Sequence, residues 1–349
     1  GKIFLIIWAV LMTLISGALL GCEIMRGFGK ANLDSKSATT APVMAKSALY
    51  EGNTTGDSKW QDDWIRYNGA VYDYNEDIIT FLIMGIDKDD EIVTKVAEGT
   101  DGGQADALFL LALNPHNQTI SIIGINRNTM TDVDVYDEYG RYQTTAKAQI
   151  ALQHGFGNGM EESCEYQVKA VSNLFHQLPI HGYAAINMSA IPVINDQVGG
   201  VDVVVLEDLT KFDKKLEKGA RVHLEGKTAF HYVKSRDVYI PNSNGSRLER
   251  QRQYINSFIN SARTVCRENN NAAVEIFTAI GNKMVTNISA DEISYLAPFL
   301  VSYKFDIDNI VTIDGKTEKN GKYEEFYADE NSLYEAIVNV FYEKINDKN

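Results

Sequence analysis

The clearest local signal in the sequence is ALFLLALNPHNQTISIIGI, residues 107–125. Two apolar or alternating runs, 107–113 and 119–125, flank the segment NPHNQ, whose Pro and Asn residues are typical of a turn. This pattern predicts a β-hairpin. Upstream, ITFLIMGIDKDD (79–90) is a short apolar run that ends in acidic and turn residues, which predicts a buried strand followed by a loop.

Charged residues stand at the ends of these predicted strands. Asp106 lies just before the first hairpin strand and Arg127 just after the second, at similar distances from the turn. In an antiparallel pair, both residues reach the same edge of the sheet. If the strand before Asp87 runs toward that edge, two carboxylates and a guanidinium meet at one rim. Taken singly, Asp87 and Asp106 are no more than typical loop and turn carboxylates.

The middle of the chain alternates between the two kinds of pattern. Helical spacing occurs in 147–156, 161–178 and 189–198, and strand patterns occur in 181–188 and 199–206. Strands separated by helices indicate an α/β domain with helices on the faces of the sheet.

Positive charge gathers in KSRDVYIPNSNGSRLERQRQYI (234–255), although the formal net charge of the chain is -14. So acidic a chain lacks the broad basic field that nonspecific nucleic-acid binding needs. The segment 225–236 has the character of a short helix that leads to Lys234 and Arg236. A Pro- and Asn-containing loop and a longer helix follow. The cations therefore come from two consecutive elements, which makes the segment a candidate ligand site.

The longer helix has a clear apolar face. On a 3.6-residue period, Arg247 and Arg250 lie along one margin of that face, Arg252 lies along the other, and Gln251 points close to the apolar sector. Arg near a helix start is disfavoured by the helix dipole, which indicates an anionic ligand. The alternative is a solvated face on which these cations pair with Glu249 and Asp237. The apolar face itself is formed by Leu248, Ile255, Phe258, Ile259 and Ala262.

The N-terminal run IFLIIWAVLMTLISGALLG (3–21) has the length of a single membrane-spanning helix. We favour an uncleaved anchor over residues 1–21, with Lys2 on the cytoplasmic side and the bulk of the protein outside. A cleaved signal peptide and lipid attachment at Cys22 are the alternatives. Residues 22–76 have the composition of an extracytoplasmic spacer, in which the aromatic residues of 60–74 are expected to pack on the domain that follows.

The number and spacing of the cysteines do not indicate a disulfide framework. Three in 349 residues, without a CxxC pair or a Cys/His spacing, argue against structural zinc. Cys164 and Cys266 fall in helical patterns and are expected to be buried apolar side chains. A disulfide bridge between them is left open.

The motifs taken together resemble a known family. The ordered set GID, ADALFLLALNP, NRNT, INM, QVGGV, LEGKTAFHYVKSR and RLERQRQ is similar to the LytR-CpsA-Psr family of bacterial cell-envelope proteins, over roughly residues 77–349. Members of that family are membrane-anchored and transfer glycopolymers, such as teichoic acids or capsule, from a polyprenyl pyrophosphate carrier to peptidoglycan. The resemblance implies an extracytoplasmic phosphotransferase with a three-layer α-β-α sandwich, a central mixed sheet and a long apolar pocket for the lipid.

The resemblance also implies roles for individual residues. Asp87 and Asp106 match the magnesium-binding aspartates, with Asp106 and Arg127 as catalytic residues. The pyrophosphate-binding positions are Lys234, Arg236, Arg247, Arg250 and Gln251. Bidentate Arg contacts suit a dianionic diphosphate, and Mg2+ suits the developing charge.

Three residues depart from the family pattern. Gln104 stands where an Arg is usual, Asn128 where an Asp is usual, and Lys234 where an Arg is usual. Two hypotheses follow: a magnesium-dependent glycopolymer transferase, which we prefer, or a noncatalytic module that binds a polyprenyl-linked intermediate and supports or regulates envelope assembly. Whether Gln104 faces the pocket discriminates between them, because a substitution that points away is harmless.

Overall fold

The computed structural model describes residues 23–36, 40–44, 60–88, 102–137, 139–236, 243–321 and 323–345. Its centre is a six-stranded sheet of order β11-β8-β3-β4-β5-β12. The predicted hairpin is confirmed as β4 (Ala105–Asn114) and β5 (Thr119–Ile125), which pair antiparallel with Leu108 opposite Ile125. The predicted strand before Asp87 is β3 (Ile79–Ile86), antiparallel to β4. The sheet is mixed, because β8 (Gly182–Asn187) lies parallel to β3 and β12 (Ile310–Thr312) lies parallel to β5, while β11 (Met284–Thr286) is antiparallel to β8.

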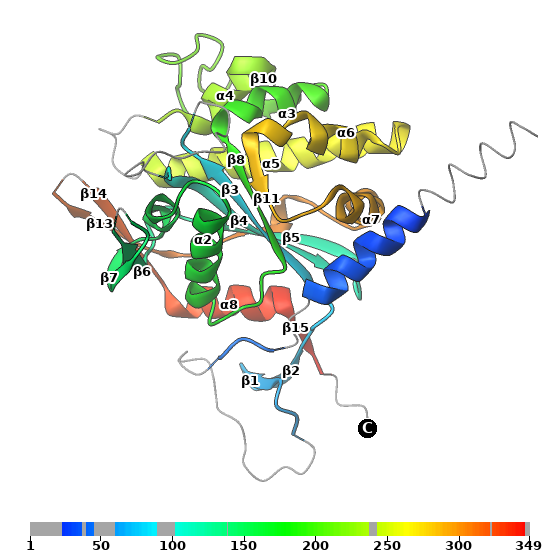
Figure 1. Ribbon diagram of the computed structural model, residues 1–349. Coiled ribbons are helices and arrows are strands. Elements are labelled where there is room, and N and C mark those ends of the chain that lie inside the picture. Colours follow the sequence, from blue (N-terminus) through cyan, green and yellow to red (C-terminus); the bar gives the residue numbers. More distant parts are fainter. Residues whose placement is uncertain are drawn as a thin grey trace, which may run out of the picture.

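Helices cover both faces of this sheet (Figure 1). On one face, α2 (Glu161–Leu174) and α8 (Glu330–Phe341) pack against alternate residues of β3 and β4, such as Leu82 and Leu108. The other face is covered mainly by α5 (Ser243–Glu268), α6 (Ala272–Ala279) and α7 (Ala290–Ser302), which contact Phe81 and Phe109. Because successive side chains of a strand point to opposite faces, the sheet separates two cores, as predicted for an α/β domain.

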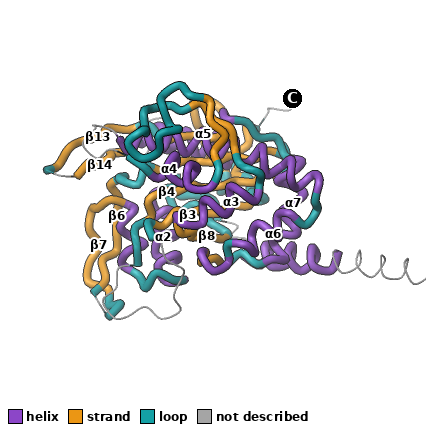
Figure 2. Tube along the Cα trace, turned by 90° about the horizontal axis from the view of Figure 1, so that it is seen from above, coloured by secondary structure: helices purple, strands orange, loops and turns teal. Residues whose placement is uncertain are grey.

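Smaller elements surround this centre. A third core joins α3 (Ile191–Gln197), α4 (Gly226–Lys234) and the ribbon of β9 (Val201–Val204) and β10 (Arg221–Leu224) to α5. Two further hairpins, β6 (Met130–Tyr136) with β7 (Tyr142–Gln149) and β13 (Gly315–Asn320) with β14 (Tyr323–Ala328), lie side by side at one end of the molecule (Figures 1 and 2).

Part of the predicted spacer is ordered. Residues 23–36 form a helix whose Lys36 pairs with buried Glu292 at 2.7 Å. β1 (Trp64–Tyr67) and β2 (Ala70–Tyr74) form a sheet with the C-terminal β15 (Tyr342–Lys344). Tyr67 stacks on Tyr334 of α8, which confirms that the aromatic residues of 60–74 pack on the domain.

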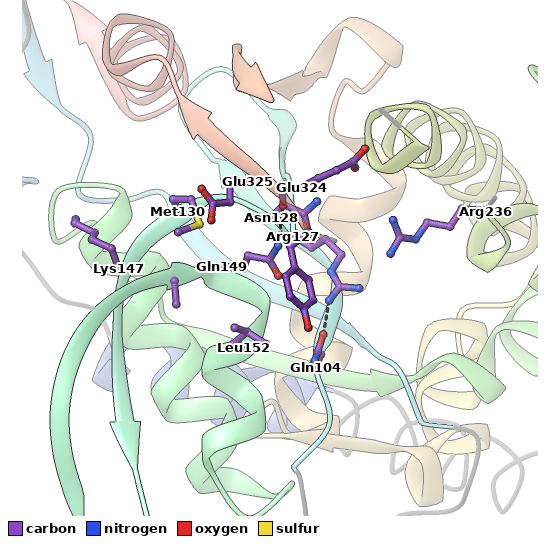
Figure 3. Close-up of a pocket in the computed structure, with 12 residues that line it drawn as sticks. Gln104, Arg127, Asn128, Met130, Lys147, Gln149, Leu152, Arg236, Glu324 and Glu325 are labelled. Carbon is purple, nitrogen blue, oxygen red and sulfur yellow. Dashed lines mark hydrogen bonds between the residues drawn. The ribbon is translucent and has the colours of Figure 1, made fainter. Parts of the chain in front are cut away.

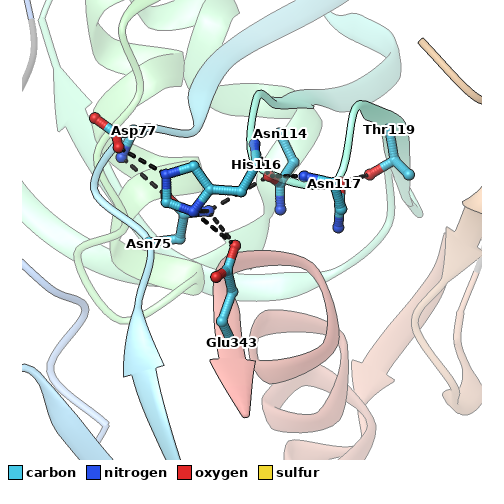
Figure 4. Close-up of polar contacts among 7 residues, drawn as sticks. All are labelled: Asn75, Asp77, Asn114, His116, Asn117, Thr119 and Glu343. Atoms are coloured by element: carbon cyan, nitrogen blue, oxygen red, sulfur yellow. Dashed lines mark hydrogen bonds and ion pairs between the residues drawn. The ribbon is translucent and has the colours of Figure 1, made fainter. Parts of the chain in front are cut away.

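A polar cluster connects the β4–β5 turn to β15 and to the segment before β3 (Figure 4). The side chain of Asn114 accepts the backbone N–H of His116 at 2.9 Å and so shapes the turn. The His116 ring lies between two carboxylates, with Nε2 2.8 Å from Asp77 Oδ2 and Nδ1 3.0 Å from Glu343 Oε1. Asn75 also donates to Glu343 at 2.7 Å. Three chain segments therefore meet at one imidazole: 75–77, the β4–β5 turn and β15.

Three expectations need correction or completion. Only residues 150–156 of the predicted helix 147–156 are helical, as a 3-10 segment, because 147–149 continue β7 and pair with β6. The long helix begins at Ser243, ahead of Arg247, whereas 237–242 lie outside the described residues. Cys164 and Cys266 lie in α2 and α5 as expected and are both free, so they form no bridge. Cys164 is buried as expected, whereas Cys266 is only partly buried. Within the described part of the chain, no helix has both the length and the apolar character needed to cross a bilayer. The predicted anchor, 1–21, lies outside that part.

Candidate functional site

The candidate site begins at the rim of the central sheet where β3 and β5 end and β4 begins. Asp87 directly follows β3, and its backbone N–H donates to the carbonyl of Gln104 at 3.1 Å. Arg127 follows β5, and one of its guanidinium nitrogens lies 2.6 Å from Asp106 Oδ1. The prediction that these residues share one edge of the sheet is confirmed.

Asp106 lies inside β4 rather than just before it, at a β-bulge. Gly85 pairs with Ala107 and Ile86 pairs with Ala105, so Asp106 is the extra residue. Ala105 packs in the core on the α2 and α8 face, whereas Ala107 packs on the opposite face. The bulge therefore shifts by one residue the alternation of side chains between the two faces of the sheet. Bulges of this kind re-aim side chains near functional sites. Here the re-aimed carboxylate contacts Arg247 of α5.

The Asp106 carboxylate is shared by two arginines. Arg247 Nη1 lies 3.2 Å from Oδ2, and Arg247 Nη2 donates to the Asp106 carbonyl at 3.4 Å. Burial lowers the pKa of Arg247 to about 10; Asp106 opposes this shift, whereas Arg236 and Arg127 add to it by repulsion. A cluster of guanidinium groups around one carboxylate is short of negative charge and favours an anionic ligand.

The end of α4 supplies two more cations. Lys234 Nζ lies 3.0 Å from Asp87 Oδ1. Arg236 is directed toward Arg127 across a pocket (Figure 3), and burial and then Arg127 lower its pKa. Within the described residues, no hydrogen bond or ion pair is recorded for the Arg236 guanidinium. We call the following residues the rim cluster: Asp87, Asp106, Arg127, Lys234, Arg236 and Arg247.

Arg250 and Gln251 are directed elsewhere. Arg250 is fully buried, and its guanidinium donates to the Glu207 carboxylate at 2.5 Å and to the backbone carbonyls of Tyr232 and Ser235. Gln251 donates to the carbonyl of Val233 at 3.1 Å. These carbonyls are at the C-terminal end of α4, where helix carbonyls lack intrahelical partners. The two side chains therefore hold the α4 end that carries Lys234 and Arg236.

The pocket beside the rim cluster has a volume of about 640 Å3. Gln104 and Asn128, two of the departures from the family pattern, both line it. Gln104 accepts a hydrogen bond from Arg127 (Figure 3), so it faces the site and orients a cation there. The departure from the family pattern at position 104 therefore lies within the candidate site, next to Arg127.

An apolar cavity of about 370 Å3 lies between the sheet and α5. The predicted apolar face of α5 is confirmed, because Ile255, Phe258, Ile259 and Ala262 line this cavity. Phe109 and Ile122 of the sheet form the opposite wall, and α3 and α7 close the sides. The same helix thus carries Arg247 at the rim and an apolar wall further along.

The two predicted metal ligands already have cationic partners in this arrangement. Lys234 pairs with Asp87, and the two arginines pair with Asp106. No group of three or more His, Cys, Asp or Glu residues suitable for a metal occurs in the parts of the chain that the structure describes. Two carboxylates at one rim are nevertheless donors that Mg2+ accepts, provided that phosphate oxygens and water supply the remaining ligands.

Sequence reasoning missed the partners that lie far away in the chain. Glu207, which binds Arg250, and Tyr323 and Glu324, which line the pocket, were not among the candidates. No local pattern marks them, because their partners come from segments far away in the sequence. β14, for example, is held beside the pocket by a hydrogen bond from the Phe326 N–H to the Asn128 carbonyl, at 2.9 Å.

Comparison with known proteins identifies the family. A sequence model described as the LytR_cpsA_psr family matches residues 41–339. The chain belongs to this family. The match begins before residue 77, so it includes the aromatic segment that packs on α8.

Among relatives in this family, the polyisoprenyl-teichoic acid–peptidoglycan teichoic acid transferase TagU of Bacillus cereus is 28% identical over 215 residues. The aligned part spans 61% of this chain and 62% of that relative, less than two thirds of its length. TagU of Bacillus licheniformis is 26% identical over 277 residues, which cover 78% of this chain and 80% of the relative.

Solved structures of the family share the fold. The crystal structure of Bacillus subtilis TagV superposes with a TM-score of 0.57 at 24% identity, over 75% of this chain and 96% of that one. A structure of TagT bound to LI-WTA gives a TM-score of 0.57 at 19% identity, over 76% of this chain and 91% of that one. These similarities confirm the mixed α/β architecture around a central mixed sheet.

Proposed function

We propose that this protein transfers a glycopolymer, of the teichoic acid or capsule kind, from a polyisoprenyl diphosphate carrier to peptidoglycan. The observation that carries the proposal is the course of α5. Arg247 of this helix lies in the rim cluster, and Ile255, on the wall of the apolar cavity, follows about 12 Å further along the helix. A cationic cluster followed by an apolar cavity at this spacing matches the charged head and apolar tail of an isoprenoid diphosphate. The names of the TagU relatives support the same class of substrate.

The charge of the rim cluster suits the head group. Four cations face two carboxylates, so the cluster is positive overall even within a strongly acidic chain. A dianionic diphosphate would accept hydrogen bonds from Arg127, Arg236 and Arg247, with Lys234 as a point charge. Asp106 would hold two of these guanidinium groups in place. We assign Arg250 and Gln251 a supporting role, because their donors engage the end of α4.

The reaction assigned to this site is a phosphoryl-centred displacement. A hydroxyl oxygen of the acceptor forms a bond to the phosphorus that carries the polymer, and the bridging P–O bond to the lipid phosphate breaks. Polyisoprenyl monophosphate leaves, and the hydroxyl proton passes to water in the open pocket. The arginines stabilise charge on the phosphoryl oxygens, which is the main source of catalysis in such reactions.

Magnesium is part of the proposal as a companion of the diphosphate. Asp87 and Asp106 would hold it, and it would supply charge neutralisation at the phosphoryl oxygens. Because both carboxylates have cationic partners in the protein alone, we expect no tight Mg2+ binding without diphosphate. Calorimetric titration of Mg2+ with and without inorganic diphosphate measures this difference.

We also propose that residues 1–21 anchor the protein in the cell membrane by a single pass. The domain would then act on the outer side, where peptidoglycan lies. The apolar character of that segment supports this placement.

The deciding experiment follows the release of polyisoprenyl monophosphate from a synthetic polyisoprenyl diphosphate glycan in the presence of peptidoglycan. The full chain should release it. Asp106→Asn should retain the volume of the side chain but lose turnover, because its charge holds two arginines and completes the metal site. Arg252→Ala, outside the rim cluster, is the control and should remain active. Unchanged turnover in Asp106→Asn would remove the rim cluster from the mechanism.

A second candidate function is favoured by Gln104. Since this residue lies in the pocket and contacts Arg127, the site has one cation fewer than the family pattern. The alternative is a noncatalytic module that binds the diphosphate lipid. It predicts lipid binding without monophosphate release in the same assay, and release restored by Gln104→Arg.

A further inference from the structure

One wall of the pocket beside the rim cluster is formed by residues that belong neither to the rim cluster nor to the apolar cavity. Hairpin β13–β14 supplies Tyr323, Glu324 and Glu325, and hairpin β6–β7 supplies Met130, Lys147 and Gln149. Gln149 donates to the Glu324 carbonyl at 2.7 Å, and Phe326 donates to the Asn128 carbonyl at 2.9 Å. These two bonds join the hairpins into one wall of the pocket.

The lining of this pocket has the chemistry of a carbohydrate site. Gln104 and Gln149 line the pocket, and their amide groups retain donor and acceptor positions beyond their bonds to Arg127 and to the Glu324 carbonyl. Met130 and Leu152 add apolar side chains to the lining, and Tyr323, a residue that is 68% exposed, adds an aromatic ring. Sugars present hydroxyl groups at their edges and C–H groups on their faces, so a mixed surface of this kind suits them.

The position of the pocket indicates which sugar it takes. The apolar cavity runs along α5, so the lipid phosphate of the donor would lie on the α5 side of the rim cluster. In a phosphoryl displacement, the attacking and leaving oxygens are roughly in line. The attacking hydroxyl would therefore approach from the side away from the apolar cavity, where residues of the two hairpins line the pocket. Figure 2 shows both hairpins at the same end of the molecule.

We propose that hairpins β6–β7 and β13–β14 form the acceptor subsite, which binds a peptidoglycan glycan strand with Tyr323 against a sugar face. This inference rests on the proposed function for the identity of the acceptor. The volume of about 640 Å3 accommodates a short oligosaccharide segment rather than a whole strand, so the strand would extend over the open edge of the pocket.

The test measures binding of soluble glycan strands, released from peptidoglycan by a muramidase, to the full chain without any lipid donor. Tyr323→Ala should weaken binding roughly two- to tenfold, because it removes one aromatic contact. Tyr323→Trp should restore binding. Tyr139→Ala is the matched control and should bind normally, because Tyr139 is similarly exposed, at 64%, but lies at the β6–β7 turn and does not line the pocket.

A second measurement separates this inference from the proposed function. The affinity for a polyisoprenyl diphosphate analogue that carries its glycan should be the same in Tyr323→Ala and in the unmodified protein. Loss of analogue binding with unchanged strand binding would mean that the pocket takes the sugars of the donor, and it would overturn the acceptor assignment. Equal losses at Tyr139 and Tyr323, or none at either, would overturn it as well. Failure of the unmodified protein to bind the lipid analogue would instead contradict the proposed function.

Discussion

Arg247 is the side chain on which the rim cluster depends most directly. It is 4% exposed, and both of its terminal nitrogens engage Asp106. If it also donates to a diphosphate, Arg247→Ala should remove charge-assisted hydrogen bonds worth roughly 1.5 to 3 kcal/mol, which is about ten- to a hundredfold in affinity. Arg247→Lys should recover only part of this loss, because a point charge cannot replace a planar fork. Titration with a soluble isoprenoid diphosphate analogue measures these effects.

The control for Arg247 lies on the same helix. Arg252 donates to the Ile307 carbonyl at 3.0 Å and is 3.7 Å from Glu249, so its contacts lie outside the rim cluster. Arg252→Ala should leave analogue affinity unchanged. Equal small losses in both variants would show that the cations are only a charged surface.

Arg250 is expected to behave differently from Arg247 despite lying three residues away. Arg250→Ala leaves the Glu207 carboxylate and two carbonyls without their donors, so it should lower the free energy of unfolding by roughly 2–4 kcal/mol. Urea denaturation provides the measurement, with Arg247→Ala as the comparison. Normal stability together with a lost affinity for diphosphate would instead place Arg250 in direct contact with the ligand.

At the scale of elements, His116 couples the β4–β5 turn to β15 and to the segment before β3. The hydrogen bond to Asp77 is the largest cause that raises its pKa, and Glu343 adds to it. A histidine with a raised pKa stabilises the fold fully below its unfolded pKa, near 6.5, and loses this contribution as the pH rises through the folded pKa.

His116→Gln should therefore be less stable than the unmodified protein at pH 6, and the difference should shrink toward pH 8.5. Because the groups are largely exposed, we expect less than about 1 kcal/mol. Thermal unfolding at several pH values tests this effect. Buried His181, whose pKa is lowered by burial, is present in both proteins and cancels in the comparison. A difference in stability that grows with pH would contradict a stabilising role for protonated His116 between these segments.

The apolar cavity along α5 contains a natural reporter. Cys266 lines the cavity and is free, whereas Cys164 is fully buried in another core, where burial raises its pKa to about 12. A polyisoprenyl diphosphate in the cavity should protect Cys266 from a maleimide. Inorganic diphosphate, which occupies only the rim cluster, should not. Peptide mapping by mass spectrometry gives the labelling of each cysteine, and equal protection by both ligands would argue against a lipid in the cavity.

At the scale of the whole molecule, the proposed anchor predicts the topology. With residues 1–21 in the membrane, everything after Cys22 should lie outside the cytoplasm. Protease added to intact protoplasts should digest the domain and remove a C-terminal epitope, while a cytoplasmic marker protein stays intact. Survival of the epitope until the membrane is dissolved would refute this orientation.

Residue periodicity alone predicts most of the strands and helices around the central sheet and which charged residues meet at its rim. Residue periodicity reflects which side chains can be buried, so the β4–β5 hairpin, α2, β8 and the apolar face of α5 could be predicted, as could the meeting of Asp87, Asp106 and Arg127 at one rim. The partners of the charged side chains could not be predicted in this way, because they depend on the tertiary fold. Arg247 and Arg250 lie on the same margin of α5, yet one contacts Asp106 and the other contacts Glu207. The bulge at Asp106 and the wall formed by β14 likewise depend on contacts between distant segments. The physical reason is that burial follows a local period, whereas the pairing of a charge depends on which distant group the fold brings within hydrogen-bonding distance.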